Sequence, residues 1–130
     1  MGKEIKSKLQ LENLAFDKIE FLREGTSSDA ELEMKIQSNI AKKNDDEMYR
    51  VTLIVTGVKE KEYSFEIRLT GFFSFQTDTE LTDKEKQEII SKNTVAILMP
   101  YMRSEISLLT AQPGMECVVL PLVNTGKMFE

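Results

Sequence analysis

Apolar and polar residues alternate along the first half of the chain, which is typical of strands that bury one face. Polar or glycine-containing connections separate four such segments. We predict strands at about Leu9–Arg23, Leu32–Gln37, Tyr49–Thr56 and Tyr63–Phe75. The third and fourth are separated by Gly57–Glu60, which predicts a hairpin turn. Consecutive strands with short turns indicate an antiparallel meander.

The first predicted strand is long, and its alternation changes phase twice. Its apolar pairs are Leu9 and Leu11, then Leu14 and Phe16, then Ile19 and Phe21. Because one inserted residue moves the following side chains to the other face, each phase change predicts a bulge or a bend.

The second half of the chain has helical patterns. A capping box at Thr82-Asp-Lys-Glu predicts a short helix that continues to about Ser91. Asn93 can cap a longer helix over Thr94–Thr110, because apolar residues recur there at spacings of three and four. Pro100 lies inside that helix and predicts a kink.

Strands followed by helices predict an α+β fold: a four-stranded antiparallel sheet with a short helix and a long kinked helix packed on one face. With no repeat or linker in 130 residues, we expect a single domain over residues 1–130, with residues 1–8 flexible. One helix gives little cover for the many large apolar side chains, so the pattern also predicts an oligomer.

The charge balance argues against nucleic acids and membranes as partners. The chain has 17 Lys and Arg against 22 Asp and Glu, for a net charge of −5. Such a chain has no general attraction to phosphate backbones or anionic bilayers. Neither a secretory signal nor an apolar run long enough to insert into a membrane is present in the sequence. We therefore expect a cytoplasmic protein.

Two features of the composition exclude several classes of enzyme. The chain has no histidine and one cysteine, so it cannot form a Ser-His-Asp triad, a His-ligated metal site or an internal disulfide. Asp45-Asp46-Glu47 lacks the spacing and the glycine of a calcium loop. We expect a protein that is not an enzyme and holds neither cofactor nor metal, with Cys117 as a small buried apolar residue.

The second predicted strand has two interpretations. Leu32, Met34 and Ile36 form an apolar stripe that alternates with charged and polar residues. The stripe can belong to the core. Alternatively, it can stay partly open on an edge strand and receive extended apolar segments of another chain. Methionine suits such a surface because its flexible thioether adapts to many shapes.

Beyond the strands, the residues resemble a known family. The helical segment contains Ala96-Ile-Leu-Met-Pro-Tyr-Met-Arg-Ser-Glu105, followed by Pro113-Gly114 and by Leu120-Pro-Leu-Val-Asn124. In this order the segments are similar to those of the bacterial export chaperone family SecB. Supportive matches extend back through the strands to Glu66-Ile67 and Gly71-Phe72-Phe73-Ser74.

The resemblance implies a chaperone that works without ATP, holds unfolded or precursor proteins and delivers them to the motor ATPase SecA. It also implies a homotetramer, a dimer of dimers in which the sheets enclose the long helices. Family positions for client contact match Leu32, Met34 and Ile36. Family positions that govern tetramer formation match a different set of side chains, namely Tyr63, Phe65, Ile67 and Leu69.

The match is weaker where the family docks SecA. That acidic outer face is represented here by Glu66, with Asp17 and Glu20 as nearby substitutes for family positions that fall on Lys18 and Leu22. The sequence after Asn124 is nearly without the C-terminal helix of many relatives. Two alternatives therefore stay open. One is a SecB-like chaperone dedicated to another partner, such as an antitoxin; the other is a small α+β module that binds one ligand or partner.

Overall fold

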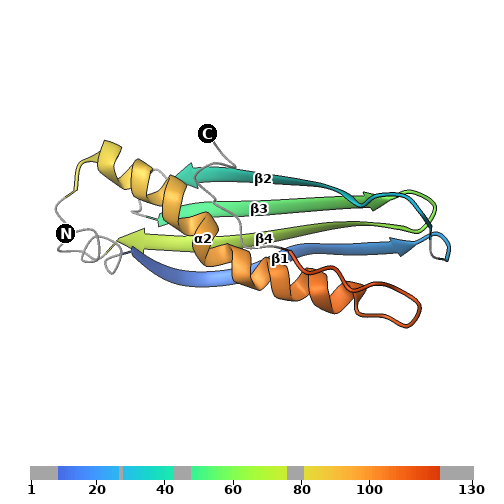
Figure 1. Ribbon diagram of the computed structural model, residues 1–130. Helices are drawn as coiled ribbons and strands as arrows, with labels where there is room; N and C mark the ends of the chain where they lie inside the picture. The colour runs from blue at the N-terminus through green and yellow to red at the C-terminus, as the bar shows by residue number, and fades with distance from the viewer. Residues whose placement is uncertain (1–8, 27, 43–47, 76–80, 121–130) are drawn as a thin grey trace.

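The computed structural model describes residues 9–26, 28–42, 48–75 and 81–120. It consists of one antiparallel sheet with a long helix across one face (Figure 1). The chain order is β1 (Leu9–Arg23), β2 (Glu33–Lys42), β3 (Met48–Lys59), β4 (Tyr63–Phe75) and α2 (Asp83–Thr110). The α+β prediction is confirmed. Predictions for residues 1–8, 45–47 and 121–124 lie outside the described residues.

The predicted phase changes in β1 are confirmed as irregularities of the ladder. β1 pairs antiparallel with β4, and its register shifts between Leu11 and Asn13 and again between Phe16 and Lys18. Each shift adds one residue to β1, so the apolar side chains return to the helix side after each bulge. The long strand can therefore keep one apolar face along its length.

The order of the strands differs from a simple meander. β2, β3 and β4 are consecutive neighbours, but β1 pairs with β4, so the sheet order is β1-β4-β3-β2. The prediction of a full meander is wrong at β1. Alternation identifies which face of a strand is buried, but it does not identify the neighbouring strand. As a result, the connection between β1 and β2 crosses the end of the sheet.

One helix replaces the predicted pair. The capping box is confirmed: the Glu85 amide donates to Thr82 Oγ1 at 3.1 Å, and the Thr82 amide donates to Glu85 Oε1 at 3.1 Å. The helix then continues to Thr110 without a break at Asn93. The Thr94 hydroxyl donates to the carbonyl of Ile90 at 2.6 Å, within the helix, so no new N-terminus forms there.

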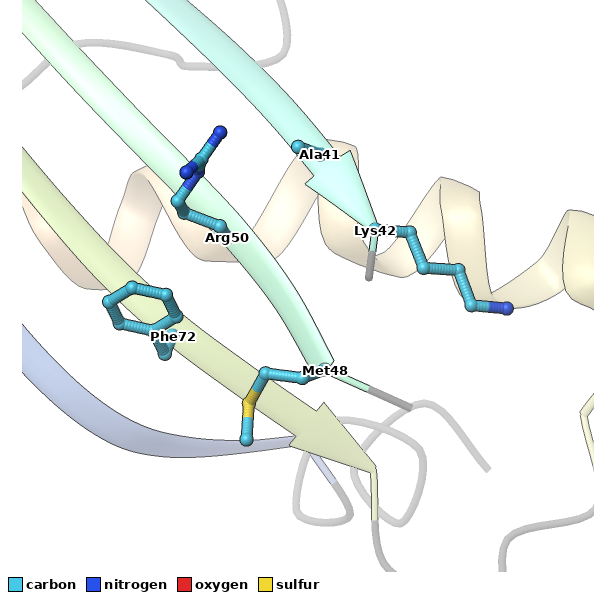
Figure 2. A pocket seen from close by; sticks show the side chains of 5 residues that line it. All are labelled: Ala41, Lys42, Met48, Arg50 and Phe72. Carbon is cyan, nitrogen blue, oxygen red and sulfur yellow. The ribbon is translucent and has the colours of Figure 1, made fainter. Parts of the chain in front are cut away.

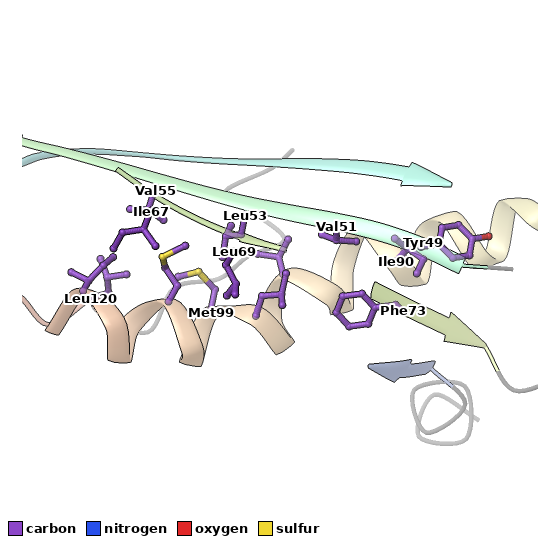
Figure 3. Packing of buried hydrophobic residues seen from close by; sticks show 14 of the residues in the cluster. Tyr49, Val51, Leu53, Val55, Ile67, Leu69, Phe73, Ile90, Met99 and Leu120 are labelled. Atoms are coloured by element: carbon purple, nitrogen blue, oxygen red, sulfur yellow. The ribbon is translucent and has the colours of Figure 1, made fainter. Parts of the chain in front are cut away.

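The core lies between α2 and the two central strands (Figure 3). Alternate residues of β3 and β4 are fully buried, among them Leu53 and Leu69. They meet buried side chains of α2 such as Leu98, and Gly71 of β4 permits this approach, since an added Cβ would lie 2.9 Å from Leu98 Cδ2. After the helix the chain turns back, and Leu120 joins the same cluster.

In the ranges listed above, no helix is both long and apolar enough to cross a membrane.

Candidate functional site

The predicted apolar stripe lies at one edge of the helix-side face of the sheet. Met34 and Ile36 are on β2, opposite Gly57 and Val55 of β3, and Leu32 immediately precedes β2. We call Leu32, Met34 and Ile36 the β2 stripe. All three side chains are half-buried and pack against the core cluster. The β2 stripe is therefore continuous with the core and still accessible from outside.

The position of the helix accounts for this partial cover. α2 packs on β3 and β4 and crosses the sheet obliquely, with its first turns near the end of β2 and its last turns near the end of β1 (Figure 1). The start of β2, which carries the stripe, therefore lies away from the helix axis. β2 is also an edge strand, paired with β3 alone among the described strands. An edge of this kind can accept an added strand.

Gly57 shapes the sheet behind the β2 stripe. The prediction that Gly57 belongs to the hairpin turn is wrong, because β3 continues to Lys59. A Cβ built on Gly57 would lie 2.4 Å from two ring carbons of Phe65, its partner on β4. The missing side chain lets the Phe65 ring lie over Gly57, whose ladder partner on the other side is Met34. A glycine opposite an aromatic residue was the available sequence signal, but the turn propensity of glycine obscured it.

An aromatic cluster extends the stripe across the sheet. Phe21 of β1 stacks on Tyr63 with ring centroids 5.4 Å apart, and Tyr63 stacks on Phe65 at 6.3 Å. Burial raises the pKa of the Tyr63 hydroxyl. Together with Met34 and Gly57, these rings form an apolar band that reaches from β2 to β1. The sequence placed Phe21 on the apolar face but did not bring it into this band.

The crossover connection is fixed to the sheet by a buried carboxylate, Glu62. Its side chain accepts a hydrogen bond from the Ser28 amide at 2.9 Å and pairs with Lys59 at 3.0 Å. These contacts, led by the Ser28 amide, lower the pKa of Glu62, while Glu62 raises the pKa of Lys59. The backbone carbonyl of Glu62 also accepts from the Glu24 amide at 2.8 Å. The residues that lead into Leu32 are therefore held on the β3–β4 turn.

Arg23 fixes the same end of the molecule to the segment after the helix. Its guanidinium donates to the carbonyls of Gly25, Pro113 and Gly114 at 3.2, 3.2 and 3.4 Å. One side chain thus joins the end of β1, the crossover connection and the turn after α2. The contacts with Pro113 and Gly114 were not predicted, because they link positions 90 and 91 residues apart in the sequence.

The side chains predicted to govern tetramer formation lie in the core of the single chain. Tyr63, Phe65, Ile67 and Leu69 alternate along β4 and are all buried beneath α2 and its return segment. Such side chains can affect another subunit only through the position of the sheet and helix that cover them. Their role in assembly stays a prediction.

On the outer face of the sheet, opposite α2, the carboxylate of Glu66 lies between two cations. It is 2.7 Å from Arg68 Nε and 3.2 Å from Lys18 Nζ, and these two contacts, Arg68 first, lower its pKa. The negative charge of this predicted SecA-docking residue is therefore compensated within the chain.

The two other predicted docking residues differ in their surroundings. Asp17 lies at the second bulge of β1, and its carboxylate accepts a hydrogen bond from the Thr70 hydroxyl. Glu20 is exposed and lies opposite Glu66 in the β1–β4 ladder. The structure thus brings all three residues to the outer face, and their docking role stays a prediction.

The far side of α2 carries a second apolar surface. Tyr101, Leu108 and Val119 are 45%, 71% and 65% exposed, and Leu108 and Val119 border a hollow of about 600 Å³ between the helix and its return segment. Cys117 borders the same hollow and is exposed, so the prediction of a buried cysteine is wrong. Its thiol donates to the Ser107 carbonyl at 3.4 Å, because the return segment runs beside the helix, with Cys117 facing outward and Val118 packing against the core.

Among the residues that the structure describes, there is no cluster of three or more Cys, Asp or Glu side chains that could hold a metal ion. The Asp45-Asp46-Glu47 segment lies outside that part.

Comparison with known families agrees with this arrangement. The family model for SecB, described as preprotein translocase subunit SecB, matches residues 7–130. The chain belongs to the SecB family. SecB family members are chaperones, so the family supports a chaperone role and is consistent with a protein that is not an enzyme.

Individual relatives are identical to this chain at less than a third of the aligned residues. The chain is 28% identical over 133 aligned residues to the uncharacterized protein MJ0357 of Methanocaldococcus jannaschii, covering 95% of this chain and 84% of that protein. It is 30% identical over 87 residues to the protein-export protein SecB of Anaplasma phagocytophilum, covering 64% of this chain and 55% of that SecB.

A solved structure has the same SecB-like fold. The SecB-like chaperone Rv1957 of Mycobacterium tuberculosis, solved in complex with a ChAD peptide from the HigA1 antitoxin, superposes with a TM-score of 0.74. The alignment covers 94% of this chain and 92% of that one at 11% identity. At this identity the likeness establishes the fold alone.

Proposed function

We propose that this protein is a holdase that binds unfolded or precursor proteins through the β2 stripe and the aromatic band behind it. The observation that carries the proposal is the half-buried state of Met34 and Ile36 on an edge strand and of Leu32 immediately before it. An extended client segment laid along β2 would bury the rest of these side chains and gain about 25 cal/mol per Å² of apolar area. Binding through apolar burial needs no nucleotide and no particular client sequence.

Anchoring of the crossover connection supports the same proposal. The hydrogen bonds to Glu62 hold the chain entering β2 in one conformation before a client arrives. A prepared surface loses less conformational entropy on binding than a mobile one. Most of the conformational entropy lost on binding is therefore lost by the client rather than by the chaperone.

The proposed working form is a cytoplasmic homotetramer. The exposed side chains on the far side of α2 support self-association, since a contiguous apolar surface of this kind is unusual on a monomer. Several stripes on one assembly would then bind one long client with avidity. A single exposed thiol, Cys117, fits a reducing compartment.

Delivery of clients to SecA for export is the first candidate pathway, with docking proposed at Glu66, Asp17 and Glu20. The ion pairs of Glu66 with Lys18 and Arg68 reduce the free negative charge on that face. This favours the second candidate, a chaperone dedicated to another partner, such as the antitoxin whose peptide is bound in the SecB-like structure.

The test is the light-scattering mass of the full chain, alone and mixed with a reduced, alkylated and permanently unfolded protein. We expect a mass of four chains that rises by the mass of the client. A folded form of the same client is the control and should leave the mass unchanged. A protein that ignores several unrelated unfolded chains would instead be a module for one ligand, and the holdase proposal would be wrong.

A further inference from the structure

The outer face of the sheet has a hollow that the proposed client site does not use. It has a volume of about 390 Å³ and lies at the end of the sheet where β2 ends and β3 begins (Figure 2). Ala41, Lys42, Met48, Arg50 and Phe72 line it. Known ligand sites have volumes of about 300–1,000 Å³, so this hollow can receive a few side chains.

The lining combines apolar surface with one available cation. Phe72 is only half-buried and lies beside Met48, both on the side of the sheet away from α2 (Figure 2). Arg50 is the direct partner of Phe72 across the β3–β4 ladder. The other cation, Lys42, lies 5.7 Å from the centre of the Tyr49 ring and is engaged there.

Arg50 differs from the charged groups of β1 and β4 that have a partner on this face. Glu66 pairs with Lys18 and Arg68, and the Glu12 carboxylate accepts from the Ser74 hydroxyl at 2.6 Å. Arg50 is exposed and has no ion pair or hydrogen bond from its side chain within the described residues.

From this charge pattern we infer that the hollow binds an extended peptide segment of a protein partner, carrying a carboxylate two residues away from a large apolar side chain. In an extended chain, residues i and i+2 face the same way, about 6.5–7 Å apart. Arg50 and Phe72 are neighbours on one face, with Cβ atoms about 4.5–5.5 Å apart, so both groups can be met at once. A guanidinium can hold a carboxylate through two parallel hydrogen bonds.

The site is independent of the proposed client surface. The β2 stripe faces α2, whereas Arg50 and Phe72 face away from it. A chaperone could therefore hold a client on one face and contact an acidic partner on the other. The partner preferred here is acidic, in contrast to the basic partner that a docking surface of free carboxylates would select.

The test uses the full chain and a capped peptide, Gly-Ser-Phe-Ser-Asp-Ser-Gly, titrated in an NMR experiment that follows backbone amides. We expect shifts at Met48, Arg50 and Phe72, and weaker binding when salt is added. Arg50→Gln should weaken binding of the peptide roughly five- to thirtyfold, because it removes the charge-assisted hydrogen bonds to the peptide carboxylate. A peptide with Asn in place of Asp should lose a similar factor.

Lys35→Gln is the matched control, because it removes one positive charge from the outward side of β2 at the other end of the sheet. Equal loss with Arg50→Gln and Lys35→Gln would indicate general charge attraction and overturn the inference. Binding that appears only in an Asp45→Asn, Asp46→Asn variant would assign the hollow to the chain's own carboxylates, with the same consequence. Binding of an unfolded protein, measured on Arg50→Gln, should be unchanged, which separates this inference from the holdase proposal.

Discussion

The centre and the β2 edge of the same sheet face have the same alternating sequence pattern but different surroundings. On β4, Ile67 is completely buried beneath α2, whereas on β2 Met34 and Ile36 remain half-buried. The difference arises from the oblique path of the helix, not from the strands themselves. An apolar stripe is therefore core or binding surface according to what lies over it.

The largest expected effect is a difference in stability between alanine variants of two isoleucines that face each other across the β1–β4 ladder. Ile67 is 0% exposed and Ile19 is 46% exposed. Ile67→Ala should cost about 2–5 kcal/mol of unfolding free energy, because it leaves a cavity in the core. Ile19→Ala removes the same atoms from a half-open site and should cost about 1 kcal/mol. Chemical denaturation of both variants measures the difference, and equal costs would contradict the assigned cover.

A somewhat smaller loss is expected at Gly57, where the covered band meets the β2 stripe. Gly57→Ala places a methyl group against the Phe65 ring and should cost about 1–3 kcal/mol through overpacking. Phe65→Leu in the same chain should recover part of that cost, because the smaller side chain can yield. A double-mutant cycle by chemical denaturation tests this coupling, and simple additivity would show that the two residues do not interact.

The start of the helix fixes which part of the sheet is covered. Thr82→Ala removes the side chain that accepts from the Glu85 amide and should cost about 1 kcal/mol. Thermal unfolding gives the change. Thr82→Ser keeps the accepting hydroxyl and serves as the control, so an equal loss in both variants would exclude the capping interaction as the cause.

The smallest expected effect is a pH dependence of the folding stability that comes from Glu62 at the crossover connection. The folded pKa of Glu62 is lowered by the Ser28 amide and Lys59. Its ionised form therefore contributes stability above the pKa of the unfolded chain, about 4.3, and that stability is lost as the pH falls through the folded pKa. Glu66 has a lowered pKa too and adds a contribution of the same sign.

Glu62→Gln isolates the contribution of Glu62. We expect this variant to lose less stability between neutral and acid pH than the parent chain, as measured by denaturation at a series of pH values. It should also show faster amide hydrogen exchange at Ser28, since that amide loses its charged acceptor. An unchanged pH profile would mean that Glu62 does not anchor the connection.

The sequence predicted the features that depend on neighbouring residues. The phase changes in β1 became two bulges, and the capping box at Thr82 begins the helix. It failed where distant residues decide the outcome. The pairing of β1 with β4, the ring of Phe65 against Gly57 and the continuous helix past Asn93 all depend on tertiary packing.

At the candidate site, too, the predictions held where neighbouring residues decide the outcome and failed where distant residues decide it. Leu32, Met34 and Ile36 were found from their alternation, but two interpretations were open until the path of α2 was known. Cys117 was predicted to be buried because its neighbours are apolar, yet the return segment turns Val118 and Leu120 toward the core and leaves Cys117 exposed. Apolar neighbours in sequence do not establish burial in an irregular segment.

The central claim is that the open edge of the apolar face, and not its covered centre, binds unfolded chains. The direct test is the affinity of Leu32→Asp, Ile36→Asp for a permanently unfolded protein. The control is Gln37→Asp, Asn39→Asp, which adds the same charge to exposed residues of the same strand, both of them facing the side away from α2. We predict a folded assembly that binds about tenfold more weakly, or worse, with the control unchanged. Unchanged binding by the stripe variant, or equal losses in both variants, would contradict the account.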